Sequence, residues 1–194
     1  MKLYVVCGPP AGGKTRYGRD LAVRVGAVFL DNDIATEPVV EAGMEAAGLS
    51  RDDRDSTRYK NIFRDPVYEV MFQTAEVNLA HLPVVLAGPF TRESQQQDWL
   101  AWLAGRFRVP VEVHFVSCSP EVRRKRMERR GEARDHAKLA HWDSYLESTT
   151  IKPPPFEHIL VDTDADVPLQ DLSLIHISEP TRRYAIAYAL FCLK

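Results

Sequence analysis

Near the N-terminus, a glycine-rich loop lies between a short apolar run and an amphipathic stretch. Residues 3–7 are apolar without alternation, which predicts a strand buried on both faces. Residues from about 14 to 25 carry apolar side chains four positions apart, which predicts a helix with one buried stripe. The loop between them matches the pattern G-x-x-x-x-G-K-[ST], and a preceding strand and a following helix are the context in which that pattern binds phosphate. This feature therefore constrains fold and chemistry together.

The loop predicts a nucleotide site. Its glycines allow backbone N–H groups to turn inward around a β-phosphate, and the following helix adds the positive end of its dipole. Lys14 is expected to reach the β- and γ-phosphates, and the hydroxyl of Thr15 is expected to be a Mg²⁺ ligand. The expected ATP-binding residues are Gly8, Pro9, Pro10, Ala11, Gly12, Gly13, Lys14 and Thr15. The loop alone does not select ATP over GTP.

The rest of the chain alternates short apolar runs with helical patterns. Besides residues 3–7, the expected strands are 27–30, 84–87, 111–118 and 158–161. Helices are expected at about 36–48, one or two over 56–82 with Asp65-Pro66 as N-cap and first turn, 93–107, from 119, and 135–148. Five such strands predict an α/β fold with a parallel sheet covered by helices on both faces.

The position of the acidic residues narrows the class of phosphate-loop protein. The third expected strand ends Leu86-Ala87-Gly88 without a carboxylate, whereas the second is followed by Asp31 and Asp33. GTPase base-reading motifs and an LSGGQ-like segment are absent from the sequence. A carboxylate at the end of strand two could accept the proton of an attacking hydroxyl or hold Mg²⁺ through water. Asp33 is the expected base and metal-site residue, Asp31 is the alternative base, and one of the two is expected to cap the next helix.

An arginine-rich stretch supplies the third element of the prediction. Seven basic and four acidic side chains lie within residues 121–135, which is unbalanced for a plain solvated helix. Arg123, Arg126 and Arg130 are spaced to share one helix face. Phosphoryl transfer depends mainly on stabilising charge at the transferred group, and arginines on a lid suit that task. Arg126 and Arg130 are the expected catalytic lid residues, with Arg126 also binding the nucleotide, and Arg134 is a further lid candidate.

Composition excludes several other classes. With 45% apolar and 27% charged residues, the chain is typical of a globular domain. The net charge of −2 makes nucleic acid an unfavoured partner, because backbone binding needs a basic stripe. Three widely spaced cysteines without metal-ligand spacing indicate reduced thiols and a cytoplasmic protein. No apolar run approaches the roughly 20 residues that span a bilayer, so no membrane partner is expected.

These elements in this order resemble the small P-loop kinases of the AAA-33, zeta-toxin and polynucleotide-kinase group over roughly residues 2–164. The resemblance implies strand order 2-3-1-4-5, ATP and Mg²⁺ use, and the second Asp of the Asp-Asn-Asp segment, Asp33, as catalytic base. Zeta toxins carry Glu-Gly-Thr after strand three, where this chain has Ala87-Gly88-Pro89, and that departure argues against a sugar-nucleotide substrate. After the lid, an RDxxKLxxWDxYL segment resembles uncharacterised bacterial ATP-binding proteins.

Residues 173–194 differ in character from the rest of the chain. They resemble a translated sequencing-adapter tail, so the expected organisation is a kinase-like domain over 1–172 and a non-native tail over 173–194. A genuine C-terminal helix is the alternative. The tail holds three basic residues and one acidic residue, so removing it changes the net charge from −2 to −4.

The sequence therefore predicts a kinase that transfers the γ-phosphoryl group of ATP to a hydroxyl of an unidentified small or nucleotide-like acceptor. A monomer or homodimer is expected. The acceptor pocket is expected within residues 35–72, including Arg58 and Tyr59. A 5′-hydroxyl polynucleotide or zeta-toxin-like kinase, and an ATPase switch without an acceptor, are the alternatives.

Overall fold

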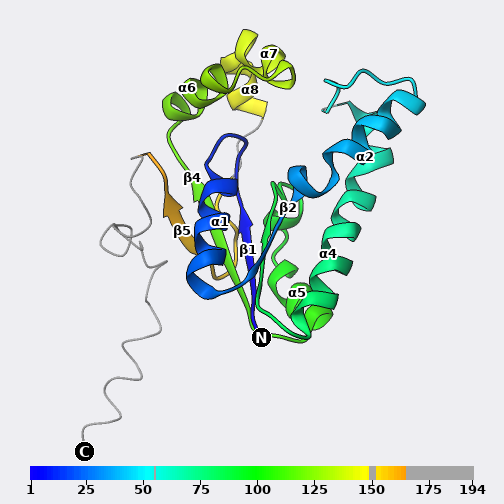
Figure 1. Cartoon of the computed structure of the whole chain (residues 1–194). Coiled ribbons are helices and arrows are strands. Elements are labelled where there is room, and N and C mark those ends of the chain that lie inside the picture. The colour runs from blue at the N-terminus through cyan, green and yellow to red at the C-terminus, as the bar shows by residue number, and fades with distance from the viewer. Residues whose placement is uncertain (55, 149–151, 165–194) are drawn as a thin grey trace, which may run out of the picture.

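A computed structural model describes residues 1–54, 56–148 and 152–164, which form one parallel sheet with helices on both faces (Figure 1). The strands are β1 (Leu3–Cys7), β2 (Val28–Asp31), β3 (Val84–Ala87), β4 (Val111–Ser117) and β5 (Ile159–Asp162). Their order is β2-β3-β1-β4-β5 with every pairing parallel. Both the fold class and the expected strand order are confirmed. The predicted tail, 173–194, and its boundary at 172 lie outside the described residues.

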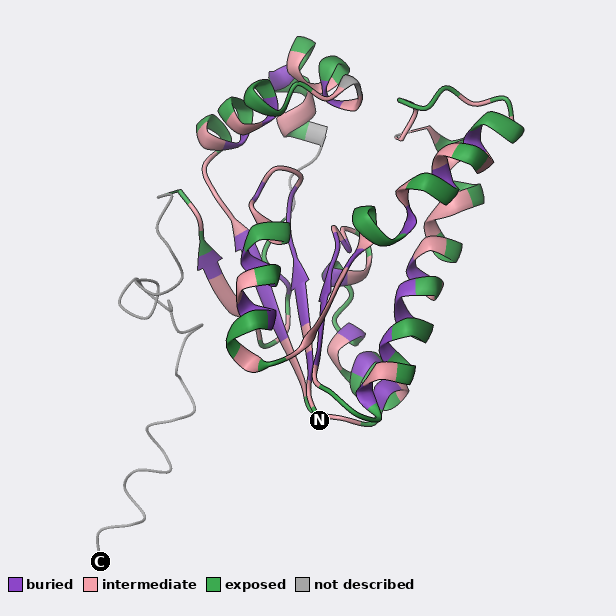
Figure 2. Cartoon of the chain, viewed as in Figure 1, coloured by how far each residue is buried: buried purple, intermediate pink, exposed green. Residues whose placement is uncertain are grey.

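The sheet separates two hydrophobic clusters, and its central strands β1 and β3 are buried almost throughout (Figure 2). The helix α1 (Lys14–Val25) covers one face through Tyr17, Leu21 and Ala22. The helices α4 (Asp65–Leu79) and α5 (Trp99–Phe107) cover the other face. Both faces of the central strands are thus removed from water, which explains why those strands are apolar without alternation.

The helix α2 (Asn32–Ala46) begins directly after β2, four residues earlier than the sequence predicted. Its N-cap is Asp31, whose side chain accepts hydrogen bonds from the backbone N–H groups of Asp33 and Ile34. The expectation that one acidic residue caps this helix is confirmed, and the residue is Asp31. The side chain of an N-cap folds back onto the helix N-terminus, whereas the side chain of a first-turn residue points outward. Asp31 and Asp33 therefore have different surroundings.

The predicted start of a helix at Asp65-Pro66 is confirmed, since α4 begins at Asp65 with Pro66 in its first turn, but Asp65 is not the N-cap. A short helix α3 (Thr57–Tyr59), capped by Ser56, runs into a π-helical turn η1 (Lys60–Arg64) and then into α4. Arg64 and Asp65 both have right-handed helical dihedral angles, so the backbone stays helical from the π-turn into α4 and leaves no place for a side-chain N-cap. Pro66 lacks an N–H and crowds the preceding turn, and a π-turn is one way in which a continuous helix accommodates it.

Two other helices are shorter than predicted. Residues Glu93–Gln95 form a 3₁₀ turn, η2, so the helix expected from 93 begins at Trp99. The lid consists of α6 (Pro120–Arg130), α7 (Ala133–Ala140) and α8 (Trp142–Ser148), and the single helix expected over 135–148 is divided at His141. In Figure 1 these three helices lie beyond the carboxyl ends of the strands. The lid thus stands over the edge at which parallel sheets bind ligands.

Candidate active site

The phosphate loop, residues 8–15, is fitted closely against β4 and the end of β5. Gly8 has φ +139°, and a Cβ there would lie 2.1 Å from the carbonyl oxygen of Val116. Gly13, with φ +95°, is the N-cap of α1. The hydroxyl of Thr163 donates to the Gly12 carbonyl at 2.7 Å. The glycines are therefore required both for backbone conformation and for close approach, as a loop that surrounds a phosphate requires.

The Lys14 side chain leaves the N-terminus of α1 and donates to the carbonyl oxygen of Pro9 at 2.8 Å. Burial lowers the pKa of Lys14 to about 8, against the opposing effect of the nearby Asp33 carboxylate. The Arg130 guanidinium also lowers this pKa. Lys14 therefore lies within electrostatic reach of both Asp33 of α2 and Arg130 of the lid. A phosphate chain bound beside Lys14 and Arg130 would have its negative charge balanced by these two cations.

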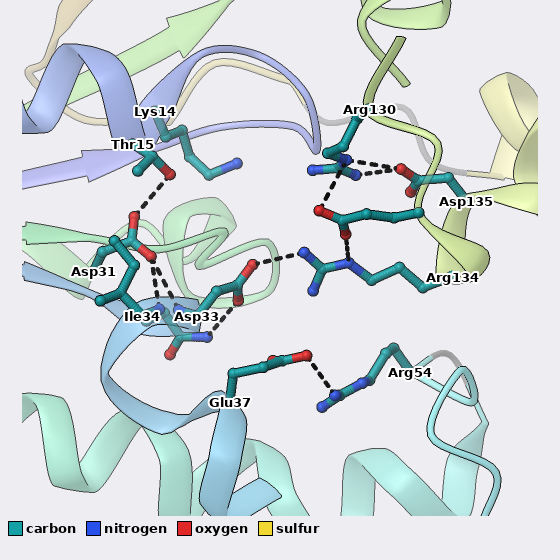
Figure 3. A network of polar contacts seen from close by, with 12 residues as sticks. Lys14, Thr15, Asp31, Asp33, Ile34, Glu37, Arg54, Arg130, Arg134 and Asp135 are labelled. Carbon is teal, nitrogen blue, oxygen red and sulfur yellow. Dashed lines mark hydrogen bonds and ion pairs between the residues drawn. The ribbon is translucent and has the colours of Figure 1, made fainter. Parts of the chain in front are cut away.

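The hydroxyl of Thr15 donates to Oδ2 of Asp31 at 2.8 Å (Figure 3). Asp31 is 7% exposed and pairs in register with Ala87 of β3. The carboxylate absent from the end of β3 is thus supplied by the adjacent strand. A hydroxyl and a carboxylate side by side are hard oxygen ligands of the kind that Mg²⁺ takes, directly or through water.

Magnesium sites in phosphoryl-transfer enzymes use few protein ligands, because substrate phosphates and water complete the coordination. Over the part of the chain that the structure describes, no group of three or more His, Cys, Asp or Glu is arranged to hold a metal ion. The Thr15–Asp31 pair fits that sparse pattern. The sequence had named Thr15 with Asp33 instead; no described hydrogen bond joins those two side chains, and the role of Asp33 in metal binding stays a prediction.

Asp33 lies in the first turn of α2 and is largely solvent-accessible. Its side chain is 54% exposed and forms an ion pair with Arg134 at 3.3 Å, which links α2 to the lid (Figure 3). Unlike Asp31, it is not engaged as a helix cap. Its carboxylate lines a cavity and is close enough to Lys14 to raise the pKa of that ammonium. An exposed carboxylate between a phosphate loop and a cavity can accept a proton from a bound hydroxyl.

The structure places the two predicted lid arginines differently. Arg126 donates to the hydroxyl and the carbonyl oxygen of Thr163, at 3.0 and 2.5 Å, and its Nη1 lies near Gly13. Arg130 donates to the carboxylate of Asp135 and forms an ion pair with Glu132 at 3.5 Å (Figure 3). Arg126 thus lies beside Gly13 of the loop, whereas Arg130 is held by Asp135 and Glu132 within electrostatic reach of Lys14.

Arg123, which the helical spacing placed with these two, has a structural role. It is 7% exposed, donates to the Tyr145 hydroxyl at 3.3 Å and packs over the rings of Trp142 and Tyr145. It therefore ties α6 to α8 inside the lid. Trp142, an apolar position of the RDxxKLxxWDxYL segment, belongs to this packing and is 9% exposed.

Two functional candidates in the lid were not anticipated, Glu132 and Asp135, whereas the sequence had named Arg134 beside Arg126 and Arg130. Asp135 is 1% exposed and holds Arg130, and Glu132 bonds both Arg130 and Arg134. The sequence signal that could have indicated this pair is an acidic residue, Asp135, five positions after Arg130. Helical spacing concealed it, because Gly131 ends α6 in a left-handed conformation and turns the chain back on itself.

A cavity of about 540 Å³ lies between α2, the η1–α4 segment and the lid. Pro10 of the loop and Asp33 line it, so it opens directly onto the site. Tyr59 lines it as the sequence predicted. Arg58 does not, because its guanidinium turns away to the carbonyl oxygen of Ala47 at 2.8 Å. This volume is in the range of small-molecule pockets.

Comparison with solved structures finds several small P-loop kinases. A proposed kinase from Chloroflexus aurantiacus shares 19% identity, with a TM-score of 0.63 and coverage of 88% of this chain and 94% of that chain. A gluconokinase from Sinorhizobium meliloti shares 22%, with a TM-score of 0.53 and coverage of 88% and 86%. A sugar kinase from a Janibacter species shares 19%, with a TM-score of 0.56 and coverage of 89% and 90%. At such identities the similarity shows the fold, which is that of a P-loop kinase.

None of the curated proteins matches the sequence significantly. No helix among the described residues is long and apolar enough to cross a membrane. The model of the AAA-33 family, described as an AAA domain, matches residues 3–151, which is well over half of the chain. This protein therefore belongs to the AAA-33 family.

Proposed function

We propose that the protein is an ATP-dependent kinase that transfers the γ-phosphoryl group of ATP to a hydroxyl of a small molecule. The observation that carries the proposal is the position of Asp33, an exposed carboxylate that lines the cavity and interacts with Lys14 of the phosphate loop. Structural neighbours named gluconokinase, sugar kinase and shikimate kinase support a small acceptor.

On the nucleotide side, the loop amides and Lys14 hold the β- and γ-phosphates, and Thr15 with Asp31 holds Mg²⁺. Mg²⁺, when bound, neutralises part of the phosphate charge. Arg130, which Asp135 and Glu132 hold within electrostatic reach of Lys14, would stabilise the charge on the transferred group. Arg126, tied to the end of β5 beside Gly13, contacts the nucleotide farther from the reacting phosphate.

On the acceptor side, the cavity positions a hydroxyl near Asp33. The hydroxyl oxygen forms a bond to the γ-phosphorus, the bond from that phosphorus to the β–γ bridging oxygen breaks, and ADP leaves with the electron pair. The proton of the hydroxyl passes to Asp33. Arg134 forms an ion pair with Asp33 at 3.3 Å and so orients this carboxylate between the phosphate loop and the lid.

The two aspartates allow a direct test. In Asp33→Asn, acceptor phosphorylation should fall by about 100-fold or more while ATP affinity stays within about threefold, because only the proton acceptor is removed. In Asp31→Asn, the Mg²⁺ concentration needed for half-maximal activity should rise, because the carboxylate beside Thr15 is lost. Both are measured by isothermal titration and by ADP release. Unchanged acceptor turnover in Asp33→Asn would refute the assignment of the base.

The acceptor is sought by measuring ADP release with hydroxylated metabolites and with 5′-hydroxyl oligonucleotides. Stimulation by metabolites supports the proposal. Stimulation by oligonucleotides alone would favour a polynucleotide kinase. Slow hydrolysis that no acceptor stimulates would favour an ATPase switch, and Lys14→Ala should still abolish it.

A further inference from the structure

The cavity beside Asp33 has a lining rich in positive charge. Its basic lining residues are Arg54, Lys60, Arg64, Arg134 and Lys138, and its acidic ones are Asp33 and Glu37. Asp33 is the base of the proposed function, and Glu37 is already paired with Arg54 at 2.7 Å. Glu93 pairs with Arg64 and Glu132 with Arg134, so the five cations and their four carboxylates leave a small excess of positive charge. The space is partly enclosed, so fields there are focused and screening by water is weakened.

Arg64 is the most firmly fixed cation of this lining that does not contact Asp33 or Glu37. Its Nη2 and Nε donate to the carboxylate of Glu93 at 2.8 and 3.3 Å, and its guanidinium packs over the ring of Tyr68. A guanidinium carries five N–H donors in a planar fork. Among the described residues, no hydrogen bond uses its Nη1. Arg64 is thus an oriented cation with donor capacity for a second anion.

The two sides of the cavity carry cations from different elements. Lys60 and Arg64 come from the η1 turn, whereas Arg134 and Lys138 come from α7 of the lid, four positions apart. Residues 60–64 form the π-helical turn η1, and both Lys60 and Arg64 of this turn line the cavity on the body side. A small anion in the cavity would meet positive charge from both the body and the lid.

We infer that the cavity binds an acceptor that carries a carboxylate or a phosphate group, and that Arg64 binds that group while a hydroxyl of the same molecule faces Asp33. The inference rests on the proposed function, because it treats the cavity as the acceptor site. Carboxylates and phosphates share the bidentate geometry that a guanidinium recognises. Arg54 supports the wall instead, because its Nε, Nη1 and Nη2 already donate to the Arg51 carbonyl, the Tyr59 hydroxyl and Glu37.

The test uses matched triplets that differ only in charge: glycerol, glycerate and glycerol 3-phosphate, and glucose, gluconate and glucose 6-phosphate. Binding to the full chain is measured by isothermal titration with Mg²⁺ and saturating ADP present, so that the phosphate loop is occupied. We expect the charged members of at least one triplet to bind at least about tenfold more tightly than the neutral member, as hydrogen bonds to a charged group allow. Preference for the carboxylate or for the phosphate monoester identifies the group.

Variants assign this binding to Arg64. Arg64→Gln should weaken binding of the charged compound about tenfold or more and leave ADP affinity unchanged. Because that change leaves Glu93 unpaired, the double variant Arg64→Gln/Glu93→Gln should give the same loss with a neutral pair in its place. Lys60→Gln, at an exposed position, should weaken binding less. Arg58→Gln is the matched control, because this arginine lies outside the cavity and should have no effect.

Two results would overturn the inference: equal or tighter binding of the neutral members, or no binding of any charged member at millimolar concentration. A charge preference that survives in both Arg64 variants would also overturn the role of Arg64. The readout is binding and not turnover, so it separates the two proposals. A charged compound that binds through Arg64 but is never phosphorylated would uphold the anion site and refute the kinase.

Discussion

At the scale of single residues, the site is a set of charges whose roles depend on burial. Asp31 and Asp33 are two positions apart, yet one is a buried cap bonded to Thr15 and the other is an exposed residue paired with Arg134. Lys14 is the cation between them and the lid. Burial disfavours its charged form, and an anion placed beside it restores that form.

This predicts that ATP binding weakens at alkaline pH. The pKa of Lys14 is lowered to about 8, so the free protein loses this positive charge as pH rises through that value. The dissociation constant of ATP should then increase by up to about tenfold per pH unit between pH 8 and 9.5, measured by isothermal titration. The terminal phosphate of ATP has a second pKa of about 6, so it is already fully ionised between pH 8 and 9.5. Lys14→Arg, which keeps its charge, should flatten the dependence; an equal slope in that variant would contradict the assignment.

A second residue-scale prediction concerns Asp135, a positioning residue that acts through Arg130. Asp135→Asn should lower kcat about tenfold to 100-fold with little change in KM for ATP, because Arg130 is no longer held toward the transferred group. Glu128→Gln, in an exposed pair with Arg124, is the control and should change neither constant. A fall in kcat that is accompanied by a large loss in the free energy of unfolding, or an increase in KM alone, would show that Asp135 has a structural role instead.

At the scale of elements, the helix termini next to the loops determine where the site residues lie. The left-handed Gly13 begins α1 under the loop, and the left-handed Gly131 ends α6 and directs the chain into α7. Both helix boundaries follow from local chemistry and could be read from sequence. The π-turn before Pro66 could not, because its continuation into α4 depends on packing of Tyr68, Met71 and Phe72 against the sheet.

The loop glycines give an element-scale prediction. Gly8→Ala should lower the free energy of unfolding by more than about 2 kcal/mol, since its Cβ would overlap the Val116 carbonyl at an unfavourable φ. Gly26→Ala, with positive φ but nothing within 4 Å, should cost about 1 kcal/mol. Gly105→Ala, in the exposed interior of α5, should stabilise by about 0.5–1 kcal/mol. Urea unfolding gives all three; the same value for Gly8 and Gly26 would contradict the close fit of the loop to β4.

At the scale of the whole molecule, the strand order brings distant segments to one edge. β1 is flanked by β3 and β4, so its loop lies where connections diverge to the two sides of the sheet. The loop, the β2–α2 junction and the lid come from three separate parts of the chain and meet there. The cavity beside Asp33 is lined by residues of both the lid and the η1–α4 segment, so it depends on how these two elements are placed at that edge.

The domain boundary proposed at residue 172 gives a prediction at this scale. A chain shortened to 1–172 should bind ATP with unchanged affinity and be at least as soluble, since the net charge changes from −2 to −4 and the apolar run 184–193 is removed. Affinity is measured by titration and solubility by light scattering against concentration. Precipitation of the shortened chain alone would show that the tail contributes to the core.

The sequence by itself determined the features that are local: the phosphate loop, the apolar strands of a parallel sheet, the acidic residues after the second strand and the arginine-rich lid. Each depends on residue types within a few positions, so physical chemistry along the chain suffices. Only the tertiary structure decided that Asp31 meets Thr15, that Arg123 packs inside the lid while Asp135 holds Arg130, and that Arg64 reaches the cavity. Those outcomes depend on strand register and helix packing between distant residues, which local patterns do not encode.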